Sequence, residues 1–214
     1  MPTRHIEVVI AAEEVSLDGT LSLPEKPRGV VVFVHGSGSS RHSPRNRHVA
    51  EVLQSEGIAT LLFDLLTTDE DQNYETRFDI GLLTRRLLLA TGWLKSAPAA
   101  SGLMIGLFGA STGAAAALRA AAELGPEIAA VVSRGGRPDL AGARELGLVS
   151  SPTLLIVGGF DDVVIELNEL AFDQMKCEKK LVIVPGATHL FEEPGTLDQA
   201  AGHAARWFVR WFGD

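Results

Sequence analysis

One serine of this chain lies in a setting that can make its hydroxyl a nucleophile. Residues 109–113 read Gly-Ala-Ser-Thr-Gly and fit the pattern Gly-x-Ser-x-Gly around Ser111. The apolar run 103–108 predicts a buried strand before it, and the alanine-rich run 114–124 predicts a helix after it. A serine on the tight turn between such elements is exposed at the carboxyl end of the strand. We therefore interpret Ser111 as a nucleophile, with a plain glycine-rich turn as the alternative.

A histidine is needed to activate this serine, because a hydroxyl is a weak nucleophile at neutral pH. His189 follows the last predicted strand, at 181–184, and so is expected at the carboxyl end of the sheet. His203 falls within a predicted helix, and the other four histidines all precede residue 50. We predict that His189 is the general base.

A carboxylate must fix the tautomer of that histidine. In this strand–turn–helix arrangement the order along the chain is Ser, then Asp or Glu, then His. Asp161 and Asp162 follow the predicted strand 153–157 and meet this requirement. We choose Asp161 and keep Asp162 as the alternative. Both could instead cap the next helix, as Asp often does.

Two backbone amides are expected to bind the oxyanion of the tetrahedral intermediate. One is the N–H of Thr112, which follows the nucleophile at the start of a helix. The other is expected from the loop 35–40, His-Gly-Ser-Gly-Ser-Ser, and we assign it to Ser37. His35 is expected to fix this loop in place rather than to react.

An open α/β sheet is predicted to position these residues. Two segments with alternating apolar residues, near 6–10 and 15–23, predict antiparallel strands. Short, continuously apolar runs predict strands buried on both faces at 30–34, 59–63, 103–108, 128–132, 153–157 and 181–184. Helices are predicted between them at 46–56, 78–95, 111–124, 138–146, 163–175 and 196–212. This order predicts a mostly parallel sheet with an antiparallel N-terminal edge and helices on both faces, and such sheets bind ligands outside the carboxyl ends of their strands.

The order of four motifs resembles the α/β-hydrolase superfamily over essentially the whole chain. The motifs are His-Gly-x-Gly at 35–38, Gly-x-Ser-x-Gly at 109–113, Gly-x-x-Asp-x-x-Val at 158–164 and Gly-x-x-His at 186–189. The segments 35–46 and 185–191 look like the dienelactone-hydrolase-related branch. The dienelactone hydrolases proper use a cysteine nucleophile, whereas this chain has Ser111. The resemblance therefore implies an α/β-hydrolase fold and ester hydrolysis by a serine enzyme rather than dienelactone as the substrate.

The substrate is expected to be a small, fairly polar ester, thioester or lactone. Residues 133–152, between the sixth and seventh predicted strands, leave room for one short helix and for no sizeable lid. Arg41 and Arg134 follow the carboxyl ends of predicted strands, and arginine suits carboxylate or phosphate. We hypothesise that Arg134, together with Arg41, binds an anionic part of the substrate. Salt bridges to acids such as Asp64 are the alternative.

Composition excludes several other classes of protein. The net charge of −8 argues against binding to nucleic acid or to an anionic membrane, where a basic surface is expected. Cys177 is the only cysteine, so no internal disulfide can form. The acidic segment 67–76 lacks the ligand spacing of a calcium loop, and we expect a solvated, mobile connector there. We predict a single α/β-hydrolase domain over residues 1–214 that is cytoplasmic and uses no metal or other cofactor. Its oligomeric state is left open.

Two other functions compete with the serine hydrolase. An acyltransferase would use the same triad and the same acyl-enzyme. A dinucleotide-binding protein is suggested by the glycines of segment 36–41 and by Asp64 at the end of the next predicted strand. Arg41 stands where that fingerprint needs its third glycine, and the match covers only this one segment. The triad motifs cover the rest of the chain as well.

Overall fold

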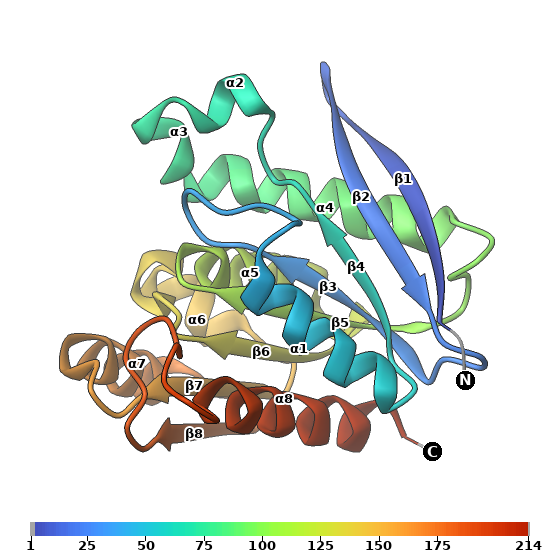
Figure 1. Ribbon diagram of the computed structural model, residues 1–214. Helices are drawn as coiled ribbons and strands as arrows, with labels where there is room; N and C mark the ends of the chain where they lie inside the picture. The colour runs from blue at the N-terminus through green and yellow to red at the C-terminus, as the bar shows by residue number, and fades with distance from the viewer. Residues whose placement is uncertain (1–2, 214) are drawn as a thin grey trace.

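The computed structural model of the protein describes residues 3–213, and an eight-stranded sheet forms its centre (Figure 1). The strands, in chain order, are β1 (Arg4–Ala12), β2 (Val15–Leu23), β3 (Gly29–Val34), β4 (Ala59–Phe63), β5 (Met104–Ala110), β6 (Ile128–Arg134), β7 (Thr153–Gly158) and β8 (Lys179–Val184). Their order across the sheet is β1-β2-β4-β3-β5-β6-β7-β8. Strands β3 to β8 run parallel, whereas β1 and β2 form an antiparallel edge. The predicted α/β architecture is confirmed.

Helices cover both faces of the sheet. One face is covered by α1 (Pro44–Ser55) and α8 (Thr196–Phe212), which contact each other in front of the sheet in Figure 1. The other face is covered by α4 (Ile80–Ser96), α5 (Thr112–Leu124), α6 (Ala143–Leu148) and α7 (Asp162–Gln174). Two short 3₁₀ helices, η1 (Gly125–Glu127) and η2 (Pro138–Ala141), complete the connections on that side.

Strands β3 to β7 are buried on both faces, as their continuously apolar sequences predict. The same prediction for 181–184 is wrong, because β8 lies at the edge of the sheet and is only partly covered, with Ile183 38% exposed. In β3, Val30, Val32 and Val34 belong to the core under α4 and α5. Val31 and Phe33 alternate with them and belong to the core under α1 and α8. Burying both faces anchors the central strands, and this fixes where their carboxyl ends lie.

The acidic segment differs from its prediction. We expected a solvated, mobile connector, but the chain forms two short helices, α2 (Thr68–Asp71) and α3 (Tyr74–Arg77). Thr67 and Glu70 form a capping box at the start of α2. Glu70 also accepts two hydrogen bonds from the buried guanidinium of Arg86, at 2.6 and 2.5 Å. This contact lowers the pKa of Glu70 to about 2, and it ties the segment to α4.

The connection between β6 and β7 holds only η2 and α6, in agreement with the prediction of one short helix and no sizeable lid. The α6 helix packs against α5 and α7, on the far side from α1. Within residues 3–213, no helix combines the length and apolar character that crossing a membrane requires.

Candidate active site

Ser111 lies on a strained turn between β5 and α5. Its backbone has φ 51° and ψ −124°, a left-handed conformation that non-glycine residues rarely adopt. A Cβ on Gly109 would lie 2.4 Å from Cα of Ala114, and one on Gly113 would lie 2.2 Å from the carbonyl oxygen of Val34. Both motif glycines are therefore required by close backbone approach, as the sequence pattern predicts. Strain of this kind persists where surrounding structure holds it, often at functional sites.

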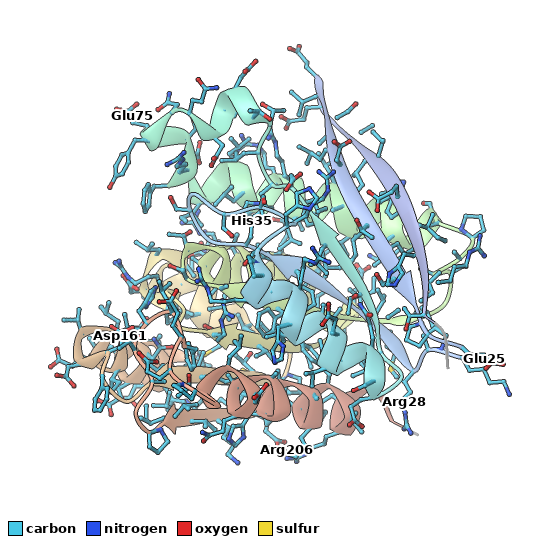
Figure 2. The ribbon with its side chains drawn as sticks, viewed as in Figure 1. Glu25, Arg28, His35, Glu75, Asp161 and Arg206 are labelled. Atoms are coloured by element: carbon cyan, nitrogen blue, oxygen red, sulfur yellow. The ribbon has the colours of Figure 1, made fainter. Side chains whose placement is uncertain are left out.

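His189 and Asp161 meet at the same edge of the sheet. His189 lies on the loop after β8, and Asp161 precedes α7, where Figure 2 labels it. Nδ1 of His189 is 2.6 Å from Oδ2 of Asp161. Asp161 occupies the N-cap position of α7 but makes no capping hydrogen bond with its side chain. Of the two candidate carboxylates, Asp161 thus contacts the histidine, while Asp162 is exposed in the first turn of α7.

A cavity of about 240 Å³ lies at the carboxyl ends of β3, β5 and β6, and Ser111 and His189 both line it. The structure therefore brings together the serine, the histidine and, behind the histidine, the carboxylate. The remaining lining residues come from the loop after β3, the start of α1, the ends of β5 and β6 and the loop after β8: Gly36, Ser37, Ser39, Ser43, Arg45, Asn46, Ala110, Arg134, Gly135 and Leu190.

The loop after β3 is fixed against the serine turn. The Ser37 N–H donates to Oγ1 of Thr112 at 2.9 Å, and a Cβ on Gly36 would lie 3.0 Å from Cβ of Ser111. His35, labelled in Figure 2, is buried beneath this loop. Its Nε2 accepts the N–H of Leu65 at 3.0 Å, which leaves Nδ1 to donate to the carbonyl oxygen of Gly36 at 3.0 Å. Burial lowers the pKa of His35, so this histidine is neutral and structural, as predicted.

Arg134 lines the cavity from the end of β6 and is only 7% exposed. Its Nη2 donates to Oδ1 of Asn46 at 3.3 Å, and its guanidinium carbon lies 5.9 Å from the ring centres of Phe108 and Phe191. Its Nε and Nη1 are buried without a hydrogen-bond partner. Burial and the nearby charge of Arg45 lower the pKa of Arg134 to about 10, so the group stays charged at neutral pH.

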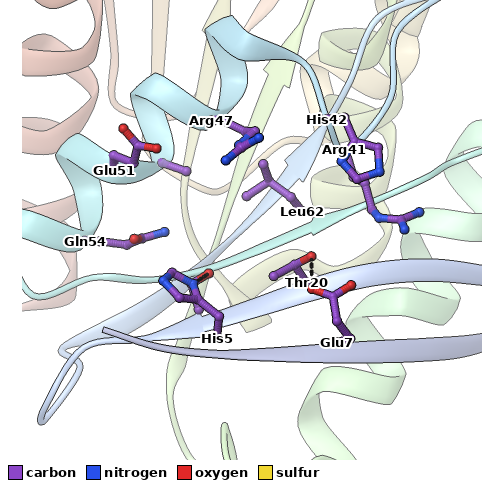
Figure 3. A pocket seen from close by; sticks show the side chains of 11 residues that line it. His5, Glu7, Thr20, Arg41, His42, Arg47, Glu51, Gln54 and Leu62 are labelled. Carbon is purple, nitrogen blue, oxygen red and sulfur yellow. Dashed lines mark hydrogen bonds between the residues drawn. The ribbon is translucent and has the colours of Figure 1, made fainter. Parts of the chain in front are cut away.

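Arg41 lies elsewhere. It lines a separate cavity of about 360 Å³ between α1 and the β1–β2 hairpin, which Figure 3 shows. Its backbone N–H donates to Oδ1 of Asp64 at 2.7 Å, and its guanidinium forms an ion pair with the same carboxylate. The structure thus places Arg41 in the salt bridge that was the alternative to substrate binding. Asp64, which a dinucleotide-binding protein would need for ribose, is occupied by this contact.

Sequence reasoning missed part of the lining. Arg45, rather than Arg41, reaches the serine cavity, where it pairs with Glu192 at 3.0 Å. Asn46 is buried in the first turn of α1 and contacts Arg134, a role that no motif indicates. Among residues 3–213, no cluster of three or more histidine, cysteine or carboxylate side chains is arranged to hold a metal ion.

Comparisons of this chain with known proteins all point to one family. Two curated proteins from Mycobacterium tuberculosis strains, provisionally named phosphoribosyl transferases, are 60% identical to this chain over 208 residues. The match covers 97% of this chain and 47% of each relative, so the chain spans about half the length of these relatives.

Solved structures agree with this picture. A crystal structure of a dienelactone hydrolase from Anabaena variabilis superposes with a TM-score of 0.95 at 54% identity, covering 98% of both chains. Est1E from Butyrivibrio proteoclasticus shares the fold, with a TM-score of 0.83 at 17% identity over 97% of this chain and 99% of its own. Residues 17–214 match the family described as the dienelactone hydrolase family. The chain belongs to the dienelactone hydrolase family and has its α/β-hydrolase fold.

Proposed function

We propose that this chain is a serine hydrolase that cleaves small acyl esters, thioesters or lactones with the triad Ser111, His189 and Asp161. One observation carries the proposal. Ser111 and His189 line one cavity, and Asp161 contacts Nδ1 of His189, which leaves Nε2 for the serine. This is the relation of nucleophile, base and orienting carboxylate that acyl transfer requires. The position of Ser111 on a strained turn between strand and helix supports its role.

Acylation follows from this arrangement. Asp161 accepts the Nδ1–H of His189, so Nε2 is the basic nitrogen that takes the proton of the Ser111 hydroxyl. The serine oxygen attacks the acyl carbon, and the carbonyl oxygen becomes an oxyanion. The N–H of Thr112 is one proposed donor to that oxyanion. The N–H of Ser37, the other proposed donor, donates to Oγ1 of Thr112 at 2.9 Å and must turn from that oxygen to the oxyanion when the substrate reacts. His189 then gives its proton to the leaving alcohol, and an acyl-enzyme on Ser111 remains.

Water completes the reaction in the hydrolase. It loses its proton to His189 as it attacks the acyl carbon, and the Ser111 oxygen leaves with that proton. An acyltransferase would replace water with another acceptor at this step. The cavity of about 240 Å³ is smaller than most ligand pockets, and no sizeable lid lies between β6 and β7. Both features favour a small substrate with little apolar cover.

The test is turnover of p-nitrophenyl acetate by Ser111→Ala. We expect loss of turnover to background, with the circular dichroism spectrum and melting temperature of a folded chain. Ser101→Ala, at an exposed serine outside the cavity, is the matched control and should retain wild-type turnover. A fluorophosphonate probe should label the wild-type chain and not Ser111→Ala. Turnover retained in Ser111→Ala would refute the proposed nucleophile.

The acceptor is tested separately. Turnover in buffer is compared with turnover in the presence of a small alcohol, and the products are separated by mass. Free acid as the main product supports hydrolysis, whereas a new ester formed in preference to acid would show that acyl transfer is the main reaction.

A further inference from the structure

The cavity between α1 and the β1–β2 hairpin lies outside the proposed active site. Its volume is about 360 Å³, and none of Ser111, His189 and Asp161 lines it. In Figure 3, α1 forms one wall and the hairpin forms the facing wall, with Leu62 of β4 between them. A cavity of this size suits a small molecule. A ligand bound there would therefore bind independently of the reaction at Ser111.

The hairpin wall of this cavity is held by its own hydrogen bonds. Nδ1 of His5 lies 2.8 Å from Oγ of Ser22, and Oγ1 of Thr20 donates to Oε1 of Glu7 at 2.8 Å. Each of these contacts joins β1 to β2 at residues that are paired in the antiparallel register. The polar groups of the hairpin thus have partners within the fold, and this wall is arranged before a ligand binds.

The helix wall differs, because its charged side chains have no partner in the fold. Arg47 and Glu51 lie one turn apart on α1, and both line the cavity. Within residues 3–213, neither side chain makes a hydrogen bond or an ion pair. A basic residue one turn before an acidic residue is the less favourable order for pairing along a helix. Both charged groups are therefore available to a ligand, the guanidinium as a donor and the carboxylate as an acceptor.

The charges that line the cavity balance each other. The lining holds two arginines and two glutamates, namely Arg41, Arg47, Glu7 and Glu51. Arg41 already pairs with Asp64, and Glu7 already accepts a hydroxyl of the hairpin at 2.8 Å. A ligand with a single charge would attract one of the two remaining groups and repel the other. A zwitterion, which carries both charges, can pair with Arg47 and Glu51 together.

We infer that this cavity binds an α-amino acid with an apolar side chain. Its carboxylate pairs with the guanidinium of Arg47, and its ammonium group pairs with the carboxylate of Glu51. These two ligand groups are attached to one carbon, and the two protein groups are neighbours on one face of a helix. The apolar side chain of the ligand covers Ala50 and Leu62, which form an apolar floor and are 2% and 7% exposed.

The test is isothermal titration calorimetry of the whole chain with leucine, leucinamide, N-acetylleucine and glycine. Leucinamide lacks the carboxylate, N-acetylleucine lacks the ammonium group, and glycine lacks the apolar side chain. Each ligand is titrated into wild type, Arg47→Met and Glu51→Gln, after circular dichroism has verified the fold of each variant. Arg144→Met on α6 and Glu166→Gln on α7 are the matched controls, because both residues are exposed and neither lines this cavity. The melting temperature in each ligand measures binding independently.

We expect leucine to bind wild type at least about 10-fold more tightly than the other three ligands, since each of them lacks one contact. Arg47→Met should bind leucine and leucinamide equally, because the carboxylate no longer has a partner. Glu51→Gln should bind leucine and N-acetylleucine equally, because the ammonium group no longer has one. The dissociation constant for leucine should rise at least about 10-fold in both variants and stay unchanged in both controls.

Three results would overturn the inference. Neither heat of binding nor a rise in melting temperature at about 10 mM leucine would show that the cavity does not bind an amino acid. N-acetylleucine bound by wild type as tightly as leucine would identify an anion site instead. Unchanged leucine binding in Arg47→Met and Glu51→Gln, or an equal loss in Arg144→Met, would place leucine outside this cavity. None of these measurements depends on Ser111, so the proposed function is tested separately.

Discussion

The Ser37 N–H donates a hydrogen bond to Oγ1 of Thr112 at 2.9 Å, across 75 positions of sequence. Thr112 is buried beside Ser111, so this bond holds the loop after β3 against the turn that carries Ser111, the proposed nucleophile. We predict that Thr112→Val, which keeps the shape and removes the acceptor, lowers kcat about 10-fold, the equivalent of about one hydrogen bond. Steady-state kinetics with p-nitrophenyl acetate measure the effect.

Thr112→Ser is the control for this prediction. It keeps a hydroxyl that can accept the Ser37 N–H, so it should stay within about threefold of wild type in kcat. The KM should change less than kcat in Thr112→Val, because the bond orders the loop and does not contact the ground-state ester. Wild-type kcat in Thr112→Val would show that the loop is positioned by other contacts.

Substitutions of Asp161 and Asp162 by Asn test which of the two carboxylates supports His189. Asp161→Asn removes the carboxylate that contacts Nδ1 of His189 and permits the wrong tautomer. Loss of the orienting carboxylate from a Ser-His-Asp triad costs about 10⁴-fold in kcat, and we expect a fall of about this size. Asp162→Asn changes the exposed neighbour and should leave kcat within about twofold, since surface substitutions rarely perturb a site. Equal losses in both variants would mean that negative charge at the start of α7, rather than the contact of Asp161 with His189, sets the activity.

The sequence predicts the sheet well because its signals are local. Each buried strand reads as a short apolar run, and β4 and α8 have the predicted bounds. The turn at Ser111 is equally local, because two glycines and a serine between strand and helix define it. The fold and the strained turn at Ser111 therefore follow from patterns within about 20 residues of sequence.

No local pattern predicts which charged side chains pair with each other when they are far apart in the sequence. Arg41 and Arg45 lie only four positions apart, before α1 and in its first turn, yet Arg41 pairs with Asp64 and Arg45 reaches the serine cavity. The turn into α1 decides which of them faces the site. Likewise, the acidic segment forms α2 because Glu70 finds Arg86, a partner 16 positions away on α4. Long-range charge pairing, which sequence spacing does not encode, accounts for these differences.

The Glu70–Arg86 contact makes the free energy of unfolding depend on pH in the acid range. The pKa of Glu70 falls from 4.5 to about 2 on folding, so the folded chain prefers the ionised carboxylate. Its contribution is therefore complete above about pH 4.5 and is lost as the pH falls towards 2. We predict that Glu70→Gln lowers the free energy of unfolding by about 2 kcal/mol at pH 7, a value that allows for partial exposure of Glu70. The difference from wild type should shrink at pH 3, as urea unfolding at the two pH values would measure.

Asp69→Asn is the control for Glu70→Gln. Asp69 is exposed in the same short helix, so its substitution should change stability by less than about 0.5 kcal/mol at either pH. A Glu70→Gln difference that stayed constant from pH 7 to pH 3 would contradict the assigned titration.

Arg134 and Arg86 should respond to the same substitution in opposite directions. Arg134→Met replaces an uncompensated buried charge with an apolar side chain of similar length next to Phe108 and Phe191. We expect the free energy of unfolding to rise by about 1 kcal/mol. Arg86→Met removes a paired guanidinium and strands the carboxylate of Glu70, which should cost about 3 kcal/mol. Urea unfolding at pH 7 measures both, and a destabilised Arg134→Met would show that its contacts within the fold outweigh the missing counter-ion.

The strained backbone of Ser111 should lower the free energy of unfolding by a measurable amount. At φ 51° and ψ −124° a side chain is strained, whereas glycine adopts such positive φ values freely. Ser111→Gly should therefore raise the free energy of unfolding by about 1 kcal/mol while abolishing turnover. Ser111→Ala keeps the Cβ and hence the strain, so it should abolish turnover without that gain. If the two variants unfold at the same urea concentration, the turn holds no strain at Ser111, and its conformation is set by the close packing of Gly109 and Gly113 alone.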